Sequence, residues 1–416
     1  MNTSSLRTKK NYYPWALVAM LWVIALLNYM DRQMIATMRP AMQMDIKELE
    51  QAANFGRLMA IFLWVYGLLS VFTGIVADRV NRKWLIIASL FIWSAVTFAM
   101  GFARTFEQLY WLRALMGFSE AFYIPAGLAM IADVHSDRTR SLAVGIHLSG
   151  IYMGQALGGF GSTISKLYSW QNAFILFGLI GIVYSLVLVF FLRDMKRVSL
   201  AGPVIRKHFF HGLFGLLRLW PFWLIVLHFS VPSLPGWAIK NWAPTLIADK
   251  LDMDMAMAGP LTTISISLAS LVGVVIGGYF SDRWVRNNIR GRIFTAVSGL
   301  VLTIPALIII GNAGSSAGII TAAVLFGFGF GVFDSNNMPI LCQFVGEDQR
   351  ATAYGFLNTV GICSGALITD YLGRSTDKGH LAEDFSKLAF IVLLVVIVQL
   401  LFLKPVVTQG KGIDGL

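Results

Sequence analysis

Four charged residues lie inside two long apolar stretches of the chain. Asp31 and Arg32 are adjacent in the first stretch, and Arg113 and Glu120 are seven residues apart in a later one. A charge costs about 2.5–3.5 kcal/mol at the centre of a membrane helix, so such residues usually face a protein interior or an aqueous cavity. An arginine can hold a carboxylate or phosphate through two parallel hydrogen bonds. A carboxylate in a cavity of low dielectric holds a proton more readily than one in water.

These charge types together indicate one kind of chemistry. An organic anion on Arg32 and a proton on a carboxylate leave an occupied site electrically balanced, as a proton-coupled anion symporter requires. We therefore expect Arg32 to bind the anion, with Arg113 beside it, and Asp31 and Glu120 to exchange protons. Sodium is open as a second coupling ion, although the arginines disfavour it. The alternative is that the four charges form ion pairs that only hold two helices together.

Further polar residues in apolar stretches extend the candidate site. Lys240 and Asp334 bring the intramembrane charges to six, with a net charge of zero. We expect Lys240, Asn336 and Asn337 to bind substrate, and we expect Asp334 to take part in proton coupling. Lys240 could instead reach the membrane surface, and the polar cluster at 334–337 could hydrogen-bond between helices. We expect Tyr123, Tyr152 and Gln155 to contact substrate as well. We expect His147 to take part in proton coupling, and the alternative for this histidine is a buried structural role.

Length and composition define the elements that must position these residues. Of 416 residues, 56% are hydrophobic and 13% are charged, which excludes a disordered chain and an ordinary soluble enzyme. A membrane helix needs about 20 mostly apolar residues, and the runs here are continuous, unlike the alternating strands of a β-barrel. We predict an all-α membrane protein with twelve transmembrane helices. They are expected at about 15–38, 55–78, 83–103, 106–133, 140–166, 170–192, 220–247, 256–281, 291–312, 315–344, 350–373 and 385–404.

The distribution of lysine and arginine predicts the orientation and the domains. These residues gather in the tails and in the loops after even-numbered helices, so the positive-inside rule places both termini in the cytoplasm. The net charge of +11 then belongs to a membrane surface, and no nucleic-acid partner is expected. We expect an N-terminal half at 1–192, a cytoplasmic linker at 193–219, a C-terminal half at 220–404 and a cytoplasmic tail at 405–416. A monomer in the bilayer of a cell membrane, in bacteria the inner membrane, is predicted.

Two motifs recur at matching places in the halves. Glu120 lies five residues before Pro125, and Asp334 lies five residues before Pro339. A Gly-x-x-x-Asp-Arg motif follows the second helix of each half, formed by Gly74, Asp78 and Arg79 and by Gly278, Asp282 and Arg283. Such repeats are typical of transporter halves related by an axis along the membrane normal. Aspartate can cap a helix and arginine can pair with a helix C-terminus, so we expect these residues, with Arg82, to form a gate.

The sequence offers no arrangement for catalysis or for a cofactor. It has no Walker motif, no Ser/His/Asp set and no His-Glu-x-x-His, and Cys342 and Cys363 fit no metal or redox spacing. We therefore expect neither an enzyme nor a resident metal or cofactor. A receptor or structural protein that kept the fold without transport would need a large additional domain, and residues 405–416 are too short for one.

Nearly the whole chain resembles the major facilitator superfamily. Its signature Gly-x-x-x-Asp-Arg-x-Gly-Arg-Arg/Lys is matched, with Asn81 in place of the second glycine, by Gly74, Asp78, Arg79, Arg82 and Lys83. The resemblance implies a major facilitator fold with twelve helices in two pseudo-symmetric six-helix halves.

The stretch Asn28-Tyr-Met-Asp31-Arg32 resembles the Asn-Tyr-x-Asp-Arg of the anion:cation symporters. These include hexonate, hexuronate, sialic acid and vesicular glutamate carriers. Arg113 and Glu120 are similar to their helix-4 pattern. The resemblance implies that Arg32 binds the substrate carboxylate and that Asp31 and Glu120 couple protons. It also implies that Arg113 is the partner of Glu120.

A second subfamily shares some of these features. Glu120-Ala-x-Tyr123 and Trp242-Ala-Pro244 are similar to the Spinster-like carriers of lysolipids, which also have the helix-1 motif. Gln155 stands where antiporters of the superfamily often have proline, and the polar cluster at 334–337 suits a hydroxylated substrate better than an acyl chain. We predict proton-coupled import of a small organic anion such as a hexonate, hexuronate or sialic acid. The alternative is a Spinster-like carrier of lysolipids, amphiphiles or drugs.

Overall fold

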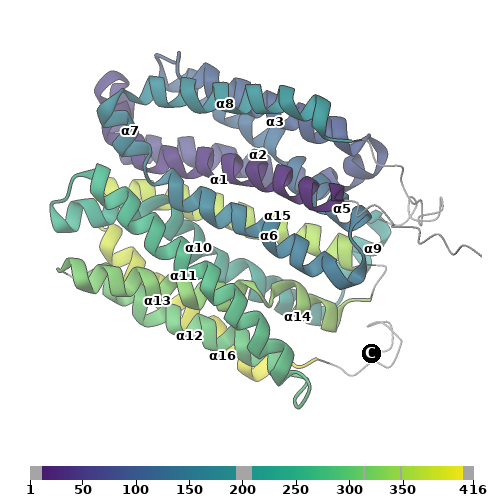
Figure 1. Ribbon diagram of the computed structural model, residues 1–416. Helices are drawn as coiled ribbons and strands as arrows, with labels where there is room; N and C mark the ends of the chain where they lie inside the picture. The colour runs from purple at the N-terminus through teal and green to yellow at the C-terminus, as the bar shows by residue number, and fades with distance from the viewer. Residues whose placement is uncertain (1–11, 194–208, 313, 347–348, 406–416) are drawn as a thin grey trace, which may run out of the picture.

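The computed structural model describes residues 12–193, 209–312, 314–346 and 349–405, and within them the chain forms helices and no strand (Figure 1). A short 3-10 helix, η1, covers Lys47–Glu50. The first α-helices are α1 (Tyr13–Asp45), α2 (Ala52–Arg79), α3 (Arg82–Met100), α4 (Phe106–Glu120), α5 (Tyr123–Val134), α6 (Asp137–Gly158), α7 (Gly161–Leu167) and α8 (Trp170–Phe191). The later ones are α9 (Phe209–Leu217), α10 (Trp220–Leu251), α11 (Met255–Trp284), α12 (Gly291–Asn312), α13 (Ser316–Asp334), α14 (Asn337–Phe344), α15 (Arg350–Asp377) and α16 (Leu381–Phe402).

Each of the twelve predicted spans lies on a long helix or on two consecutive helices. Ten such segments of the described chain are long and apolar enough to cross a membrane. The two spans that fall short by composition are 140–166, on α6 and α7, and 350–373, on α15. α6 packs against α1 and α11, and α15 packs against α2 and α10. A helix that faces other helices on several sides can carry more polar residues than one that faces lipid.

Three predicted spans are broken where continuous helices were expected. The span at 140–166 is divided between α6 and α7, and the other two breaks share one cause. The span at 106–133 is divided between α4 and α5, and the span at 315–344 is divided between α13 and α14. Pro125 and Pro339 explain both breaks, because a proline lacks an amide hydrogen and its ring clashes with the carbonyl four residues earlier. That carbonyl belongs to Ala121 in one case and to Ser335 in the other. Each of these two breaks therefore follows a helix that ends on a carboxylate.

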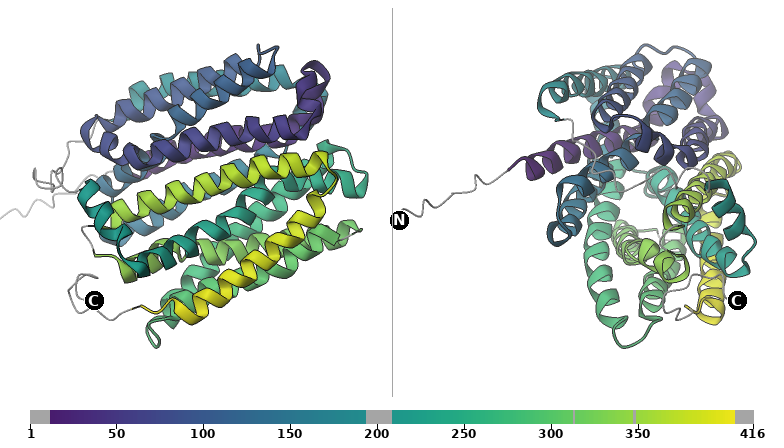
Figure 2. Two further views of the ribbon diagram at one scale, coloured as in Figure 1. Left: turned by 180° about the vertical axis from the view of Figure 1, so that it is seen from behind. Right: turned by 90° about the vertical axis from the view of Figure 1, so that its right-hand side faces the viewer.

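The long helices form two groups that lie side by side (Figures 1 and 2). Helices α1–α8 make the first group and α10–α16 make the second, and the pairs α2–α15, α6–α11 and α1–α10 join them. We call the end of the bundle that holds Tyr13 and Leu403 the terminal end. The opposite end, which holds η1 and the turn between α10 and α11, is called the distal end.

The connection between the groups is partly helical. The last part of the predicted linker at 193–219 forms α9, in which Leu216 is buried and Phe214 is exposed. α9 packs against α10 and α15. The rest of the linker, 194–208, and the predicted tail from 406 onward lie outside the described residues.

Helix α6 lies against α1 along a row of glycines. A Cβ atom on Gly154 would lie 2.3 Å from the main-chain oxygen of Leu26, and one on Gly150 would lie 2.7 Å from that of Trp22. Gly158 also approaches α1. These glycines, four residues apart, therefore let α6 pack closely against the main chain of α1.

We expect Gly154→Ala to destabilise the protein by about 1–3 kcal/mol, because the added methyl group meets main chain that cannot move aside. The matched control is Gly145→Ala on the same helix, where an added Cβ has no atom within 4 Å. Alanine is a better helix former than glycine, so the control should be neutral or stabilising. Thermal unfolding in detergent measures both variants. Equal unfolding temperatures would contradict the packing.

Candidate functional site

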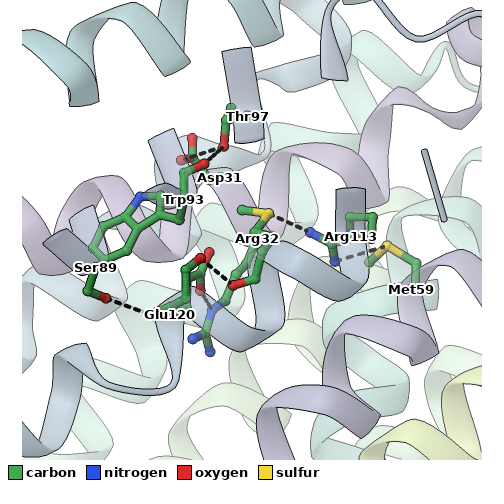
Figure 3. A network of polar contacts seen from close by, with 10 residues as sticks. Asp31, Arg32, Met59, Ser89, Trp93, Thr97, Arg113 and Glu120 are labelled. Atoms are coloured by element: carbon green, nitrogen blue, oxygen red, sulfur yellow. Dashed lines mark hydrogen bonds and ion pairs between the residues drawn. The ribbon is translucent and has the colours of Figure 1, made fainter. Parts of the chain in front are cut away.

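Arg32 and Glu120 form a buried ion pair between α1 and α4 (Figure 3). The Nε atom of Arg32 lies 2.6 Å from Oε2 of Glu120, and the two side chains are 9% and 0% exposed. Glu120 is the last residue of α4, so its carboxylate stands where the helix breaks. Removing either partner of such a pair leaves an uncompensated buried charge, which is strongly unfavourable.

Three aromatic rings enclose the Arg32 guanidinium. Its central carbon lies 4.7 Å, 4.8 Å and 4.5 Å from the ring centres of Tyr29, Phe62 and Tyr66, respectively. Aromatic faces stabilise a cation that has lost water. The Nη2 atom is buried and has no hydrogen-bond partner among the described residues. This nitrogen can therefore donate to an oxygen of an incoming anion.

Arg113 does not pair with Glu120, so the partnership implied by the family resemblance is wrong for this conformation. Its Nη1 lies 3.3 Å from the sulfur of Met116, its Nη2 lies 4.0 Å from that of Met59, and its guanidinium carbon lies 4.6 Å from the Phe62 ring centre (Figure 3). The side chain is 2% exposed. Residues seven apart on a helix are separated by about 10 Å along the axis, and Arg32 reaches Glu120 from the neighbouring helix instead.

Asp31 points toward α3 rather than toward the ion pair. Its Oδ2 accepts a hydrogen bond from Thr97 Oγ1 at 3.4 Å, and its buried Oδ1 has no partner among the described residues. Asp31 is 3% exposed. The Asp31 carboxylate interacts electrostatically with Glu120 and Arg113 but makes no hydrogen bond to either. Of the four predicted charges in the first group, Arg32 and Glu120 therefore form an ion pair, and Asp31 and Arg113 make no ion pair with another described residue.

The second group contributes a lysine and a carboxylate. Asp334 ends α13 as Glu120 ends α4, and Asn337 Nδ2 donates to Asp334 Oδ1 at 3.0 Å. Lys240 of α10 interacts electrostatically with Asp334 and with Arg32. Its side chain leans over Trp237, with Nζ 5.1 Å from the ring centre. These charges thus face the boundary between the two groups.

Asn336 is enclosed at the turn between α13 and α14 in this conformation. It is 0% exposed, and its amide donates to the main-chain oxygen of Val332 at 2.9 Å and to the Ser335 hydroxyl at 3.1 Å. These bonds hold the amide nitrogen at the turn, while the buried Oδ1 has no hydrogen-bond partner among the described residues. Substrate binding by Asn336 stays a prediction.

Gln33, Gln155 and Lys240 line a small pocket between α1, α6, α10 and α11. Its volume is about 20 Å³, room for roughly one water molecule. The structure thus brings the predicted Gln155 and Lys240 together. Gln33 was missed by the sequence analysis, since one glutamine beside two charges carries no distinct signal.

Tyrosines from four helices surround the charges. Tyr29, Tyr152 and Tyr354 interact electrostatically with Asp334, and Tyr66 interacts with Arg32. The hydroxyls of these four tyrosines make no hydrogen bond to another described residue. Sequence reasoning named only Tyr152 as a contact. Tyrosine usually lies at the membrane surface, so mid-helix tyrosines were the available signal.

Tyr123 and His147 lie apart from these charges. The Tyr123 hydroxyl donates to the main-chain oxygen of Leu21 at 2.7 Å, and the His147 ring packs edge-on to Tyr123 with the centres 6.0 Å apart. Both side chains are 0% exposed. They pack between α1, α5 and α6. Both ring nitrogens of His147 are buried without a hydrogen-bond partner among the described residues, so its part in proton coupling stays a prediction.

The predicted gate residues brace helices within each group. Arg82 pairs with Asp133, joining α3 to α5. Asp282 and Arg292 pair at 3.4 Å, joining α11 to α12. Asn81 caps α3, since its side chain accepts a hydrogen bond from the Trp84 amide at 3.4 Å. Arg283 is exposed, and Gly278 has open space where a Cβ would lie. The side chains of Gly74, Asp78 and Arg79 lie outside the described part.

From the candidate site to the distal end the two groups are hydrogen-bonded to each other. A side chain of one group donates to a main-chain oxygen of the other in the pairs Gln33 with Lys240 (2.8 Å), Ser162 with Met255 (2.8 Å), Thr163 with Ala256 (2.9 Å) and Thr263 with Ala156 (2.9 Å). Lys166 and Asp254 form an ion pair nearby. The hydrogen bond from Lys166 lowers the pKa of Asp254, so this pair stays charged in mildly acidic medium.

Asp377 adds a contact of a different kind at the distal end. This last residue of α15 accepts hydrogen bonds from the main-chain amides of Ala52 and Ala53, at 2.7 Å and 2.8 Å. These amides open α2, where the first four N–H groups of a helix have no partner within the helix. A carboxylate of the second group therefore caps a helix of the first, and the helix dipole favours it.

Apolar helices of membrane length and a charged site at the boundary of two helix groups together define a membrane transport protein. The chain belongs to the Major Facilitator Superfamily, whose family model matches residues 21–369. It is a transporter and not an enzyme. The predicted all-α major facilitator fold is confirmed.

Several relatives match the chain over most of its length. It is 22% identical to a hexuronate transporter of Bacillus subtilis, over 96% of both chains, and 23% identical to a probable galactarate/D-glucarate transporter of Escherichia coli, over 91% of this chain and 92% of that one. It is 27% identical to human protein spinster homolog 1, over 91% of this chain and 77% of that one. A solved bacterial homolog of the lysosomal transporter Spinster has the same fold, with a TM-score of 0.78 and 18% identity over 97% of this chain and 100% of that one.

Proposed function

We propose that the protein is a proton-coupled symporter of a small organic anion of the sugar-acid class. The observation that carries this proposal is the Arg32 guanidinium, which is enclosed by aromatic rings, paired with Glu120 through Nε and left with a buried Nη2 that has no hydrogen-bond partner among the described residues. A substrate carboxylate approaching that nitrogen competes with Glu120 for the same cation. Arg32 is thus the group through which substrate and coupling ion act on each other.

The charges of the site explain how a proton enters the cycle. When a substrate carboxylate takes Arg32, Glu120 becomes a buried anion without its counter-ion. A proton on Glu120 removes that cost, so substrate and proton favour each other's binding. Asp31 is a second proton acceptor, because its carboxylate has no ion-pair partner among the described residues. The arginines nearby oppose a bound sodium ion.

The helix groups supply the transport movement. We treat 1–192 and 220–404 as two halves that rock about the midplane site, with 193–219 as the cytoplasmic linker between them. The positive-inside rule favours an orientation in which the terminal end lies on the cytoplasmic side of a cell membrane. In this orientation the distal contacts, including the Asp377 cap, close the carrier toward the outside of the cell. The protein in this conformation would then receive or release substrate on the cytoplasmic side.

The hydroxyl-rich surroundings support a polar substrate. Tyr29, Tyr66, Tyr152 and Tyr354 offer hydroxyls with no partner among the described residues, and these suit the hydroxyl groups of a sugar acid. The named relatives that carry hexuronate and galactarate or glucarate support the same class. The relative named spinster homolog 1 favours the alternative, a carrier of lysolipids or other amphiphiles. An acyl chain, however, offers no hydrogen-bond partner to the four tyrosine hydroxyls.

Uptake by purified protein in proteoliposomes tests the proposal. An inward proton gradient is imposed, with and without sodium, and hexonates, hexuronates, sialic acid and a lysolipid are offered. We expect accumulation of a sugar acid that depends on the proton gradient and not on sodium. Movement of lysolipid across the bilayer with no sugar-acid uptake would replace the proposal with the alternative. Sugar-acid uptake that requires sodium alone would contradict proton coupling.

A further inference from the structure

The cation–carboxylate pair of the first group has a counterpart in the second. Arg32 lies on α1 and Lys240 on α10, the first membrane helix of each group. Glu120 and Asp334 are the final residues of α4 and α13, and each precedes a proline-induced break. The same two chemical parts, a cation on the first helix and a carboxylate at a broken helix end, therefore occur twice.

The second pair is held at the group boundary by contacts of its own. The main-chain oxygen of Lys240 accepts a hydrogen bond from Gln33 of α1, which fixes α10 against the first group at this residue. Asn337 holds Asp334 from the next helix. Lys240 lines the pocket that Gln33 and Gln155 also line. Lys240 is thus accessible from the space between the groups, and Asp334 is positioned by a hydrogen bond instead of an ion pair.

The two pairs face a common space. Lys240 interacts electrostatically with Arg32 as well as with Asp334. Asp334 in turn interacts with Tyr29 of α1 and Tyr152 of α6, both in the first group. Two cations that repel each other across one space bind two anionic groups better than one. Each cation also has a nearby protein carboxylate. When a substrate carboxylate binds the cation, a proton must neutralise that protein carboxylate.

We propose that the preferred substrate is a hydroxylated dicarboxylate, with one carboxylate on Arg32 and the other on Lys240, carried together with two protons. This inference rests on the proposed symport and deepens it by naming the charge of the substrate and the number of protons. The six intramembrane charges sum to zero. A dianion would leave the loaded site with two negative charges, and protons on Glu120 and Asp334 restore neutrality. The complete step is electroneutral, so a membrane potential does not drive it.

Two six-carbon acids that differ by one carboxylate test this inference: gluconate with one and glucarate with two. In proteoliposomes we expect wild-type protein to prefer glucarate at least tenfold in kcat/KM, with two protons per glucarate from reversal measurements at set pH gradients. Lys240→Gln should reduce the ratio of glucarate to gluconate uptake at least tenfold, and Lys240→Arg should restore most of it. The matched control is Lys250→Gln on the same helix, since Lys250 donates to Gly311 at the distal end and lies outside the site.

The possible outcomes separate this inference from the symport itself. If gluconate is carried at least as well as glucarate, with one proton, and Lys240→Gln lowers both equally, the two cations share one carboxylate and the dicarboxylate inference is overturned while the symport stands. If neither acid nor any other sugar acid accumulates, the proposed function fails as well. The proton count is measured on wild-type protein, so poor folding of a Lys240 variant leaves the inference testable.

Discussion

Arg32→Gln is expected to lower the rate of substrate uptake by about 30-fold to more than 1,000-fold. Truncating one partner of a buried, hydrogen-bonded charge pair costs about 2–5 kcal/mol, and each 1.4 kcal/mol is about tenfold. Glutamine keeps a donor but loses the charge and the planar fork. It also leaves Glu120 without its counter-ion at 2.6 Å, so the empty site is disturbed as well as the occupied one.

Two comparison variants define what the loss means. Arg32→Lys keeps the charge and removes the paired donors, so an intermediate loss is expected if geometry matters as well as charge. Arg57→Gln removes an exposed arginine of α2 and should leave uptake unchanged. Initial uptake rates in proteoliposomes, at equal amounts of folded protein, measure all three. Uptake by Arg32→Gln within a few-fold of wild type would show that Arg32 does not bind substrate.

Glu120→Gln is expected to abolish proton-driven accumulation while exchange of substrate across the membrane persists. Glutamine is close in shape to a protonated glutamate, so this variant resembles the proton-loaded carrier and still receives an anion on Arg32. It has no proton to release, and a proton gradient therefore cannot be converted into a substrate gradient. We expect the driven accumulation to fall to the level of equilibration.

The two activities are measured in the same vesicles. Counterflow into vesicles loaded with unlabelled substrate reports exchange, and uptake under an imposed pH difference reports coupling. Glu107→Gln is the matched control, because Glu107 lies in the first turn of the same helix and is exposed. If Glu120→Gln still accumulates substrate under a pH difference, Glu120 serves only to hold α1 and α4 together.

The residues that carry charge were predictable from the sequence, and their partners were not. Arg32 and Glu120 stood out because charges in apolar helices are costly wherever they occur. Their direct contact depends on the break after Glu120 and on the angle between α1 and α4, which a linear pattern does not contain. Arg113 was assigned to Glu120 by family resemblance alone, and in the structure it meets two methionine sulfurs instead.

The aromatic part of the site escaped prediction for a related reason. Phe62 and Tyr66 lie in an apolar helix in which lipid-facing and site-facing aromatic residues look the same in the sequence. Only the direction of α2 relative to α1 shows that both rings lie over Arg32. The fold itself was recoverable, since its twelve apolar stretches and its repeated motifs are long-range patterns that tolerate an error of a few residues at each end.

The distal contacts have a consequence for how such carriers diverge. Six of the hydrogen bonds between the two groups, including both to Asp377, place a main-chain atom on one side. Almost every residue type has the same main-chain amide and carbonyl. A substitution at the residue that supplies the main-chain atom therefore leaves that hydrogen-bonding group in place. Many residues at this end can therefore be replaced while these contacts between the two groups are kept. Variation of the proposed substrate site can then accumulate without a matching change in these contacts.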